Sequence, residues 1–331
     1  MATNYTNTLA GLLVLNDQNL AEIYPNQVLD NAPVVAAATA VPASAGTQHK
    51  FVKQTYAAGA GFRLINTGIT NLASRFEDVT LNCAFLDPSF TRDVALASGY
   101  ISKIGLGPYI QHETGKAIRA GMYGIEQAIF NGSSVGPQTH KFIGLPQMVE
   151  YGDTDYGTQV VDAGGSGGKS VYIIRWAEDG VAIVAGNDGR IDMNWNDDSP
   201  TIVQVVDAGG TNVYSAYRVT LGMWLSLQVG SLYDVVRICN LDGTSDDLLT
   251  DDVLSDALSL FPAGHNPNMI VMNRTARKEL QQSRTATNPT GAPAPFPTEA
   301  FGVQIVTTEA LSSTEDTVNA TTTTTSTSSS V

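Results

Sequence analysis

One stretch constrains the fold more than any other, residues 113–146, ETGKAIRAGMYGIEQAIFNGSSVGPQTHKFIGLP. Four apolar side chains recur in it at helical spacing: Ile118, Met122, Ile125 and Ile129. This period predicts one long amphipathic helix, which at 1.5 Å per residue extends over roughly 27 Å. Asn131 and Gly132 follow, and either residue at positive φ is a usual way for a helix to end.

The predicted helix has two further faces. One carries almost no side chains and consists of Ala117, Gly121, Gly124 and Ala128. The other is largely polar and consists of Lys116, Arg119, Tyr123, Glu126 and Gln127. Each interior glycine costs about 1 kcal/mol of helix stability relative to alanine. We therefore expect the small-residue face to recover this loss through a close, flat packing contact.

Composition sets limits on the class of protein. The 331 residues, 43% of them hydrophobic, are enough for a real core and about two domains. The net charge of −14 argues against a surface that wraps nucleic acid by counterion release. Cys83 and Cys239 are the only cysteines, which excludes a disulfide framework and a CxxC motif and fits a reducing cytoplasm.

The first part of the chain predicts neither export nor membrane insertion, because it shows no basic segment followed by an apolar one, and the apolar run at 33–43 is short and contains prolines. We expect residues 1–45 to form an extended arm with little core of its own. Strand-like segments follow at 48–66, around the sequence AAGAG, and at 75–85. They predict either a long protruding β-hairpin or two ordinary sheet strands.

The second half alternates strand and helix patterns. Residues 151–241 contain a series of β-branched segments between turn signals, which predicts a β-rich section. Thr250 then provides an N-cap for a helix at 251–261, with aspartates suited to the helix dipole. The remaining pattern predicts three elements and a tail: a short strand at 269–273, a basic helix at 274–284, a strand within 301–311, and a flexible Thr/Ser tail.

The glycine-rich segment at 163–170, AGGSGGKS, matches a loose phosphate-loop pattern and contains a GxSxG sequence around Ser166. Both chemistries need a helix to begin directly after the loop. The segment that follows, VYIIRW, has the pattern of a strand, so we expect neither nucleotide binding nor a hydrolase nucleophile. The four histidines lack metal-ligand spacing, and we predict no catalytic residue, metal site or cofactor.

The densest basic patch lies on the predicted helix at 274–284. Its members are Arg274, Arg277, Lys278 and Arg284. We expect a solvated helix face, or contacts with acidic residues of another subunit, rather than DNA binding.

In this order, the segments resemble the major capsid proteins of tailed double-stranded DNA phages, whose fold is named for phage Hong Kong 97. The sequence KFIGLP at 141–146 is similar to the Gly-Leu step that follows the family's long spine helix. The resemblance implies an α+β fold with six parts: an N-terminal arm (1–45), an extended β-hairpin loop with its lead-in (46–108), the spine helix of a peripheral domain (109–150), a β-rich elaboration or insertion (151–245), an axial domain with its returning strand (246–312), and a flexible tail (313–331).

The resemblance also implies the function. Copies of the chain would assemble in the host cytoplasm, as pentamers and hexamers, into an icosahedral shell that encloses double-stranded DNA without sequence-specific binding. A scaffold, portal or cement protein would be a further partner. Our candidate assembly residues are Lys50, Phe51, Lys53, Tyr56, Phe62, Arg63, Arg119, Glu126, Arg277 and Lys278. Two alternatives stay open: a phage fibre or adhesin-like surface protein, and an enzyme such as a nucleotide hydrolase that uses the glycine-rich loop.

Overall fold

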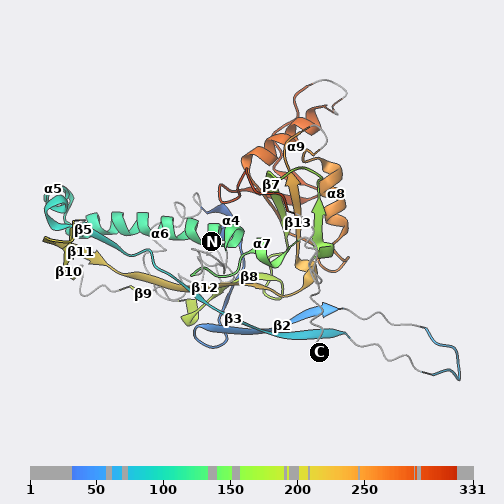
Figure 1. Ribbon diagram of the computed structural model, residues 1–331, viewed down its shortest axis with the longest axis horizontal. Coiled ribbons are helices and arrows are strands. Elements are labelled where there is room, and N and C mark those ends of the chain that lie inside the picture. Colours follow the sequence, from blue (N-terminus) through green and yellow to red (C-terminus); the bar gives the residue numbers. More distant parts are fainter. Residues whose placement is uncertain are drawn as a thin grey trace, which may run out of the picture. The chain divides into compact units, whose positions relative to one another are not determined.

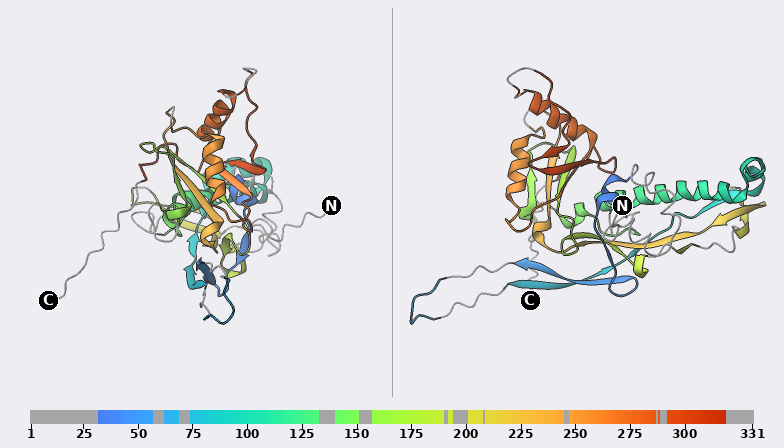
Figure 2. Two further views of the ribbon diagram at one scale, coloured as in Figure 1. Left: turned by 90° about the vertical axis from the view of Figure 1, so that its right-hand side faces the viewer. Right: turned by 180° about the vertical axis from the view of Figure 1, so that it is seen from behind.

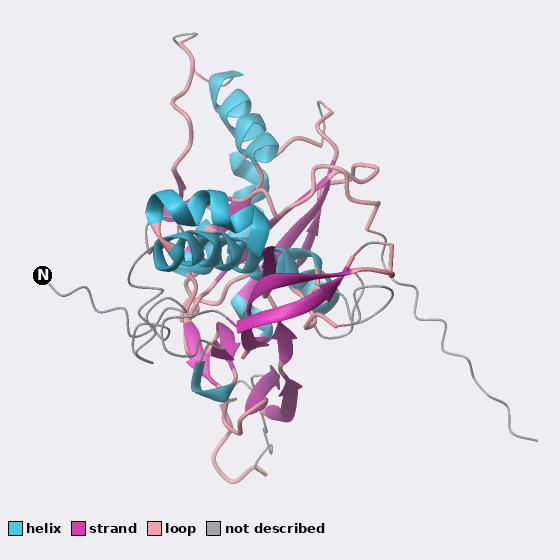
Figure 3. Ribbon diagram, turned by 90° about the vertical axis from the view of Figure 1, so that its left-hand side faces the viewer, coloured by secondary structure: helices cyan, strands magenta, loops and turns pink. Residues whose placement is uncertain are grey.

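The structure is a computed structural model (Figure 1) that describes residues 32–56, 62–68, 74–132, 140–150, 157–189, 192–193, 201–207, 209–244, 247–286, 288 and 292–318. The first part of the predicted arm and the Thr/Ser tail from residue 319 lie outside these ranges. The chain divides into two compact units. The first comprises Met1–Lys50, Thr80–Ile143 and Ala182–Gln228, and the second comprises Phe51–Val79, Gly144–Val181 and Val229–Val331. Both units combine helices and strands. Figure 3 shows the helices and strands of the described residues by colour.

The first unit is built on the long helix α6 (Leu106–Asn131). It begins before the predicted start at residue 113, because Gly105, at φ 88°, separates it from α5 (Val94–Ile104). Pro108 lies in the first turn, where its missing N–H leaves no helical hydrogen bond unmade. All four residues of the predicted apolar stripe are buried, so that prediction is confirmed. The helix ends at Asn131 as predicted, although Gly132 is extended, at φ −60°, and not left-handed.

The small-residue face of α6 lies against the end of β4 (Ala84–Leu86) and Pro88, which follows it. A Cβ atom built on Gly121 would lie 3.4 Å from Cβ of Pro88. One built on Gly124 would lie 3.9 Å from Cδ1 of Leu86. The predicted close contact therefore exists, but it is an ordinary van der Waals contact with room for a methyl group.

Two sheets complete the first unit (Figure 1). One has five strands in the order β1 (Ala40–Pro42), β8 (Val181–Ala185), β12 (Leu221–Val229) and β4, with β9 (Asp192–Met193) paired to β12. The other has three strands in the order β10 (Thr201–Val206), β11 (Val213–Val219) and β5 (Phe90–Asp93). Strand β11 is antiparallel to both of its neighbours.

The prediction that residues 1–45 have little core of their own is wrong for the part that the structure describes. Helix α4 (Pro33–Ala37) packs against α6, and β1 pairs in parallel with β8. Val34 and Ala38 are fully buried. Their small apolar side chains can pack closely beneath a helix, which is why this Ala/Val-rich run is part of the core.

The hairpin prediction is confirmed. Strands β2 (Gln48–Tyr56) and β3 (Arg75–Asn82) form a two-stranded sheet of their own, which Figure 2 shows as a long ribbon. The Gln48 side-chain amide donates to Oδ1 of Asn82 at 3.1 Å, so the first residue of β2 lies beside the last residue of β3. The alternative, in which the two strands belong to a larger sheet, does not hold.

The second unit has a six-stranded mixed sheet in the order β15 (Glu299–Ala300), β16 (Val303–Thr307), β14 (Met269–Met272), β7 (Lys169–Ile174), β13 (Val235–Leu241) and β6 (Val160–Asp162). Val236, Ile173 and Ile270 are paired neighbours and therefore share one face. That face packs against α8 (Asp251–Ser259) and α9 (Arg274–Ala286) in a single buried cluster. The Thr250 hydroxyl accepts from the Val253 N–H at 3.3 Å, which confirms the predicted N-cap.

Short elements link the larger ones. They are α7 (Leu145–Met148) and the 3-10 turns η2 (Gly157–Gln159), η3 (Asn187–Gly189) and η4 (Leu232–Asp234). The strands between residues 151 and 245 do not form one inserted domain. Strands β6, β7 and β13 belong to the six-stranded sheet, whereas β8 to β12 belong to the two sheets of the first unit. The insertion hypothesis is therefore wrong, and only part of this region elaborates the C-terminal sheet.

Candidate assembly surfaces

The described part of the hairpin tip, residues 62–68, exposes apolar side chains. Phe62 is fully exposed, Leu64 is 77% exposed and Ile65 is 90% exposed. The backbone around them is nevertheless a formed turn, since the Thr67 N–H donates to the Leu64 carbonyl at 3.2 Å and the Arg63 guanidinium donates to the Thr67 carbonyl at 3.0 Å. Contiguous exposed apolar groups of this kind mark an interaction site.

The hairpin strands also expose apolar side chains. Val52 on β2 and Phe76 on β3 are each about three-fifths exposed, at 59% and 62%. Lys50 is exposed, whereas Phe51 and Lys53 are half-buried. Tyr56 is the last residue of β2, and its side chain lies outside the described part of the structure.

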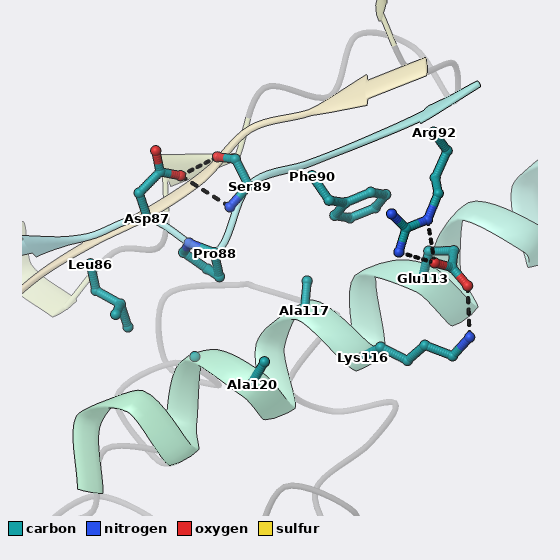
Figure 4. Close-up of a pocket in the computed structure, with 11 residues that line it drawn as sticks. Leu86, Asp87, Pro88, Ser89, Phe90, Arg92, Glu113, Lys116, Ala117 and Ala120 are labelled. Atoms are coloured by element: carbon teal, nitrogen blue, oxygen red, sulfur yellow. Dashed lines mark hydrogen bonds and ion pairs between the residues drawn. The ribbon is translucent and has the colours of Figure 1, made fainter. Parts of the chain in front are cut away.

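A groove of about 420 Å³ runs along α6 (Figure 4). Leu86, Pro88 and Phe90 line one side, and the alanines of α6 line the other.

One end of this groove is charged, because Glu113 pairs there with two cations (Figure 4). The Arg92 Nε donates to one carboxylate oxygen and the Lys116 ammonium to the other, each at 2.7 Å. Burial of Glu113 raises its pKa, but the hydrogen bonds from Lys116 and Arg92 outweigh burial and hold the pKa below its usual value. Two cations share one carboxylate, so this end of the groove has an excess of one positive charge.

Glu126, a candidate assembly residue, is fully buried in its own unit. Its carboxylate accepts from the N–H groups of Val34 at 3.0 Å and Val35 at 3.4 Å, at the start of α4. A carboxylate satisfies the unpaired N–H groups of a helix start. The prediction that Glu126 lies on an assembly surface is therefore corrected. Its neighbour on the polar face, Arg119, is half-buried and donates to the Gly115 carbonyl at 3.2 Å.

The glycine-rich loop leads into strand β7 and not into a helix, as predicted. Lys169 is buried and pairs with Glu279 on α9, with 2.6 Å between ammonium and carboxylate. The neighbouring Ser170 hydroxyl donates to the Glu315 carboxylate at 2.6 Å, and the Arg237 guanidinium lies 3.3 Å from the same oxygen. The lysine of the phosphate-loop pattern is thus used inside the subunit.

The same loop receives the C-terminal segment. Gly168 and Glu315 exchange two backbone hydrogen bonds of 2.8 and 2.7 Å. Gly168 has a φ of 111°, and a Cβ atom there would lie 2.3 Å from the Leu241 carbonyl oxygen. Only glycine fits this position, which gives the loop a structural reason for its glycines. Ser166 is exposed in this loop.

The basic residues of α9 contact their own chain. Arg284 forms two hydrogen bonds, of 2.8 and 2.7 Å, with Asp251, and Arg274 lies 2.5 Å from Glu309. Arg277 stacks over the Phe296 ring at 4.3 Å and donates to the Pro297 carbonyl at 2.6 Å. Arg274 and Arg284 thus have acidic partners in their own chain, and the Arg274 side chain is exposed on the helix face. Lys278 is exposed.

The described residues hold no group of three or more His, Cys, Asp or Glu side chains able to bind a metal ion. Within the same residues, no helix has both the length and the apolar character that a membrane crossing requires. Cys83 and Cys239 are free and buried, and burial raises the pKa of both thiols.

The sequence identifies the family. A sequence model described as major capsid protein GP7 matches residues 18–319, which is most of the chain. The chain belongs to this capsid protein family. It is therefore a structural protein of a tailed-phage capsid shell, and neither the fibre nor the enzyme alternative is favoured. No curated protein sequence matches the chain significantly.

Solved structures show the fold. A chain in the structure of bacteriophage Epsilon15 superposes with a TM-score of 0.61 at 18% identity, over 85% of this chain and 88% of that chain. The bacteriophage JBD30 capsid gives a TM-score of 0.48 at 11% identity, over 82% of this chain and 88% of that chain. The predicted α+β phage capsid fold is confirmed by the first of these matches.

For this capsid protein, the structure places the predicted assembly residues on several separate segments. Lys50, Phe51, Lys53, Phe62 and Arg63 belong to the hairpin, whereas Arg119, Arg277 and Lys278 lie on helices elsewhere. Residue spacing indicated neither the exposed apolar side chains of Val52, Leu64, Ile65 and Phe76 nor the edge position of β10.

Proposed function

We propose that copies of this capsid protein assemble as pentamers and hexamers into a closed icosahedral shell, in which the hairpin of each subunit lies on an adjacent subunit. The apolar tip of the hairpin carries this proposal. Fully burying each such side chain contributes about 1.5–3 kcal/mol. Another copy that covers Phe62, Leu64 and Ile65 would supply this stabilisation, because the described residues of their own chain leave them exposed.

The charge of the chain supports an enclosing role. With a net charge of −14, the protein would surround double-stranded DNA without gripping it through many phosphate contacts. This fits a container for a packaged genome that is assembled in the host cytoplasm. A scaffold, portal or cement protein would be an additional partner of the same assembly.

The test is to replace the three tip residues together, as Phe62→Ser, Leu64→Ser and Ile65→Ser. The folded subunit should keep its unfolding temperature, because these side chains are exposed in it. Shell yield, measured by sedimentation and electron microscopy, should fall at least about tenfold, since a loss of roughly 1.4 kcal/mol per contact already has that effect.

The matched control keeps the tip apolar, as Phe62→Leu, Leu64→Ile and Ile65→Leu. This variant should assemble with a yield close to that of the original chain. Normal shells from the serine variant would refute the role of the hairpin tip.

A further inference from the structure

Among the described residues, strand β10 forms one edge of the three-stranded sheet, in the order β10, β11, β5. Its sequence, TIVQVV, contains no charge, proline or glycine, and its six residues pair with β11 in a continuous register. Ile202 and Val206 are more than half exposed, at 59% and 55%. Natural sheets normally protect such an edge with charges, proline or a bulge. The opposite edge strand, β5, does carry Arg92 and Asp93.

The hydrogen-bond pattern shows which backbone groups of β10 point away from the sheet. The Asp207 N–H donates to the Asn212 carbonyl at 2.8 Å, in the same register as the β10–β11 pairs. Hydrogen-bonded pairs alternate along an antiparallel ladder. The odd-numbered residues of β10 therefore bond to β11. Ile202, Gln204 and Val206 direct their N–H and C=O groups to the free edge.

These three residues are complementary to themselves. In an antiparallel pairing centred on Gln204, Ile202 stands opposite Val206 of a second copy, and Val206 stands opposite Ile202. The two Gln204 side chains face each other, and on the other face Val203 stands opposite Val205. All outward N–H and C=O groups of the three residues are then paired, and no charged residue among them faces a like charge.

We propose that β10 pairs with β10 of a second copy across a two-fold axis at Gln204, giving a continuous six-stranded sheet. The contact is isologous, so it closes on itself and leaves only the charged β5 strands as edges. A register shifted by two residues would place Ile202 opposite Gln204 and leave part of the edge unpaired. This inference rests on the proposed assembly, because that assembly supplies the second copy.

Cysteine cross-linking of the full chain tests the register. Hydrogen-bonded antiparallel residues have Cα atoms about 5.5 Å apart, within the range that a disulfide spans. Gln204→Cys should therefore give a covalent dimer under mild oxidation. Ile202→Cys alone should not, because the two copies of residue 202 lie four positions apart, roughly 13 Å. A mixture of Ile202→Cys and Val206→Cys subunits should cross-link.

A second pair of variants tests whether the two-fold axis passes through Gln204, by placing charged side chains at this position. Gln204→Lys and Gln204→Glu each place like charges opposite one another and should each reduce dimer formation. A mixture of the two should restore it, because lysine then faces glutamate. Gln204 is exposed, so both variants should keep the fold of the subunit.

The outcomes separate this pairing from the shell. Shells that form without the Gln204→Cys dimer, or with an equally strong Ile202→Cys dimer, overturn the pairing and leave the shell proposal standing. The dimer in concentrated solution without shells supports the pairing and contradicts the shell. If neither shells nor the Gln204→Cys dimer form, the pairing proposal and the shell proposal are both overturned.

Discussion

At the scale of single residues, charged side chains that suggest chemistry in the sequence are largely engaged within the chain. Lys169 of the phosphate-loop pattern pairs with Glu279, and Arg284 of the basic patch pairs with Asp251. Glu126 binds the N–H groups that begin α4. In each case the partner is distant in sequence, so residue type and local spacing could not reveal it.

Lys169→Met should destabilise the subunit strongly. The substitution leaves Glu279 buried without its cation, which typically costs about 3–5 kcal/mol. The double variant Lys169→Met, Glu279→Met removes both charges and should recover most of the loss. Chemical unfolding of dissociated subunits measures the free energy of unfolding of the single and the double variant. Equal losses in the single and double variants would show that the ion pair is not the cause.

Glu113 should make stability depend on pH. Its pKa in the folded chain is held below the ordinary value of 4.5, so its stabilising contribution is complete above that value and is lost as pH falls through the folded pKa. The difference in unfolding temperature between the original chain and Glu113→Gln should therefore shrink from about pH 6 to about pH 3. A difference that stays constant over this interval would contradict the role assigned to Lys116 and Arg92.

At the scale of elements, the periodic patterns predicted well where helices and strands lie and which of the two each segment forms. The apolar stripe of α6, the Thr250 cap and the strand at β14 are where the sequence places them. The sequence could not show which sheet each strand joins, because β-branched segments look alike whichever neighbour they pair with. The burial of Val34, Ala38 and Ala40 was missed for a related reason, since an Ala/Val-rich run resembles a linker until its partners are known.

Replacing a glycine by alanine should stabilise the chain in α6 but destabilise it in the loop before β7. Gly124→Ala should raise stability by about 1 kcal/mol, because the helix gains propensity and the new methyl group meets Leu86 at an ordinary distance. Gly168→Ala should destabilise the chain, because the Leu241 carbonyl occupies the space and φ is positive. Thermal unfolding of the two variants checks this, and destabilisation by Gly124→Ala would show that the α6 contact is tighter than described.

At the scale of the whole molecule, two surfaces remain uncovered within the described residues of one chain. The hairpin tip exposes large apolar side chains, and β10 offers an unprotected edge. A shell protein can carry both, because assembly buries them. The family match and the capsid fold place the chain among proteins that build such shells.

Electron cryomicroscopy of the particles that the full chain forms when expressed alone is the most direct test of this account. We predict closed shells in which Phe62, Leu64 and Ile65 of each subunit are buried against another copy. Subunits that stay single at high concentration, or shells whose hairpin tips remain open to solvent, would contradict it.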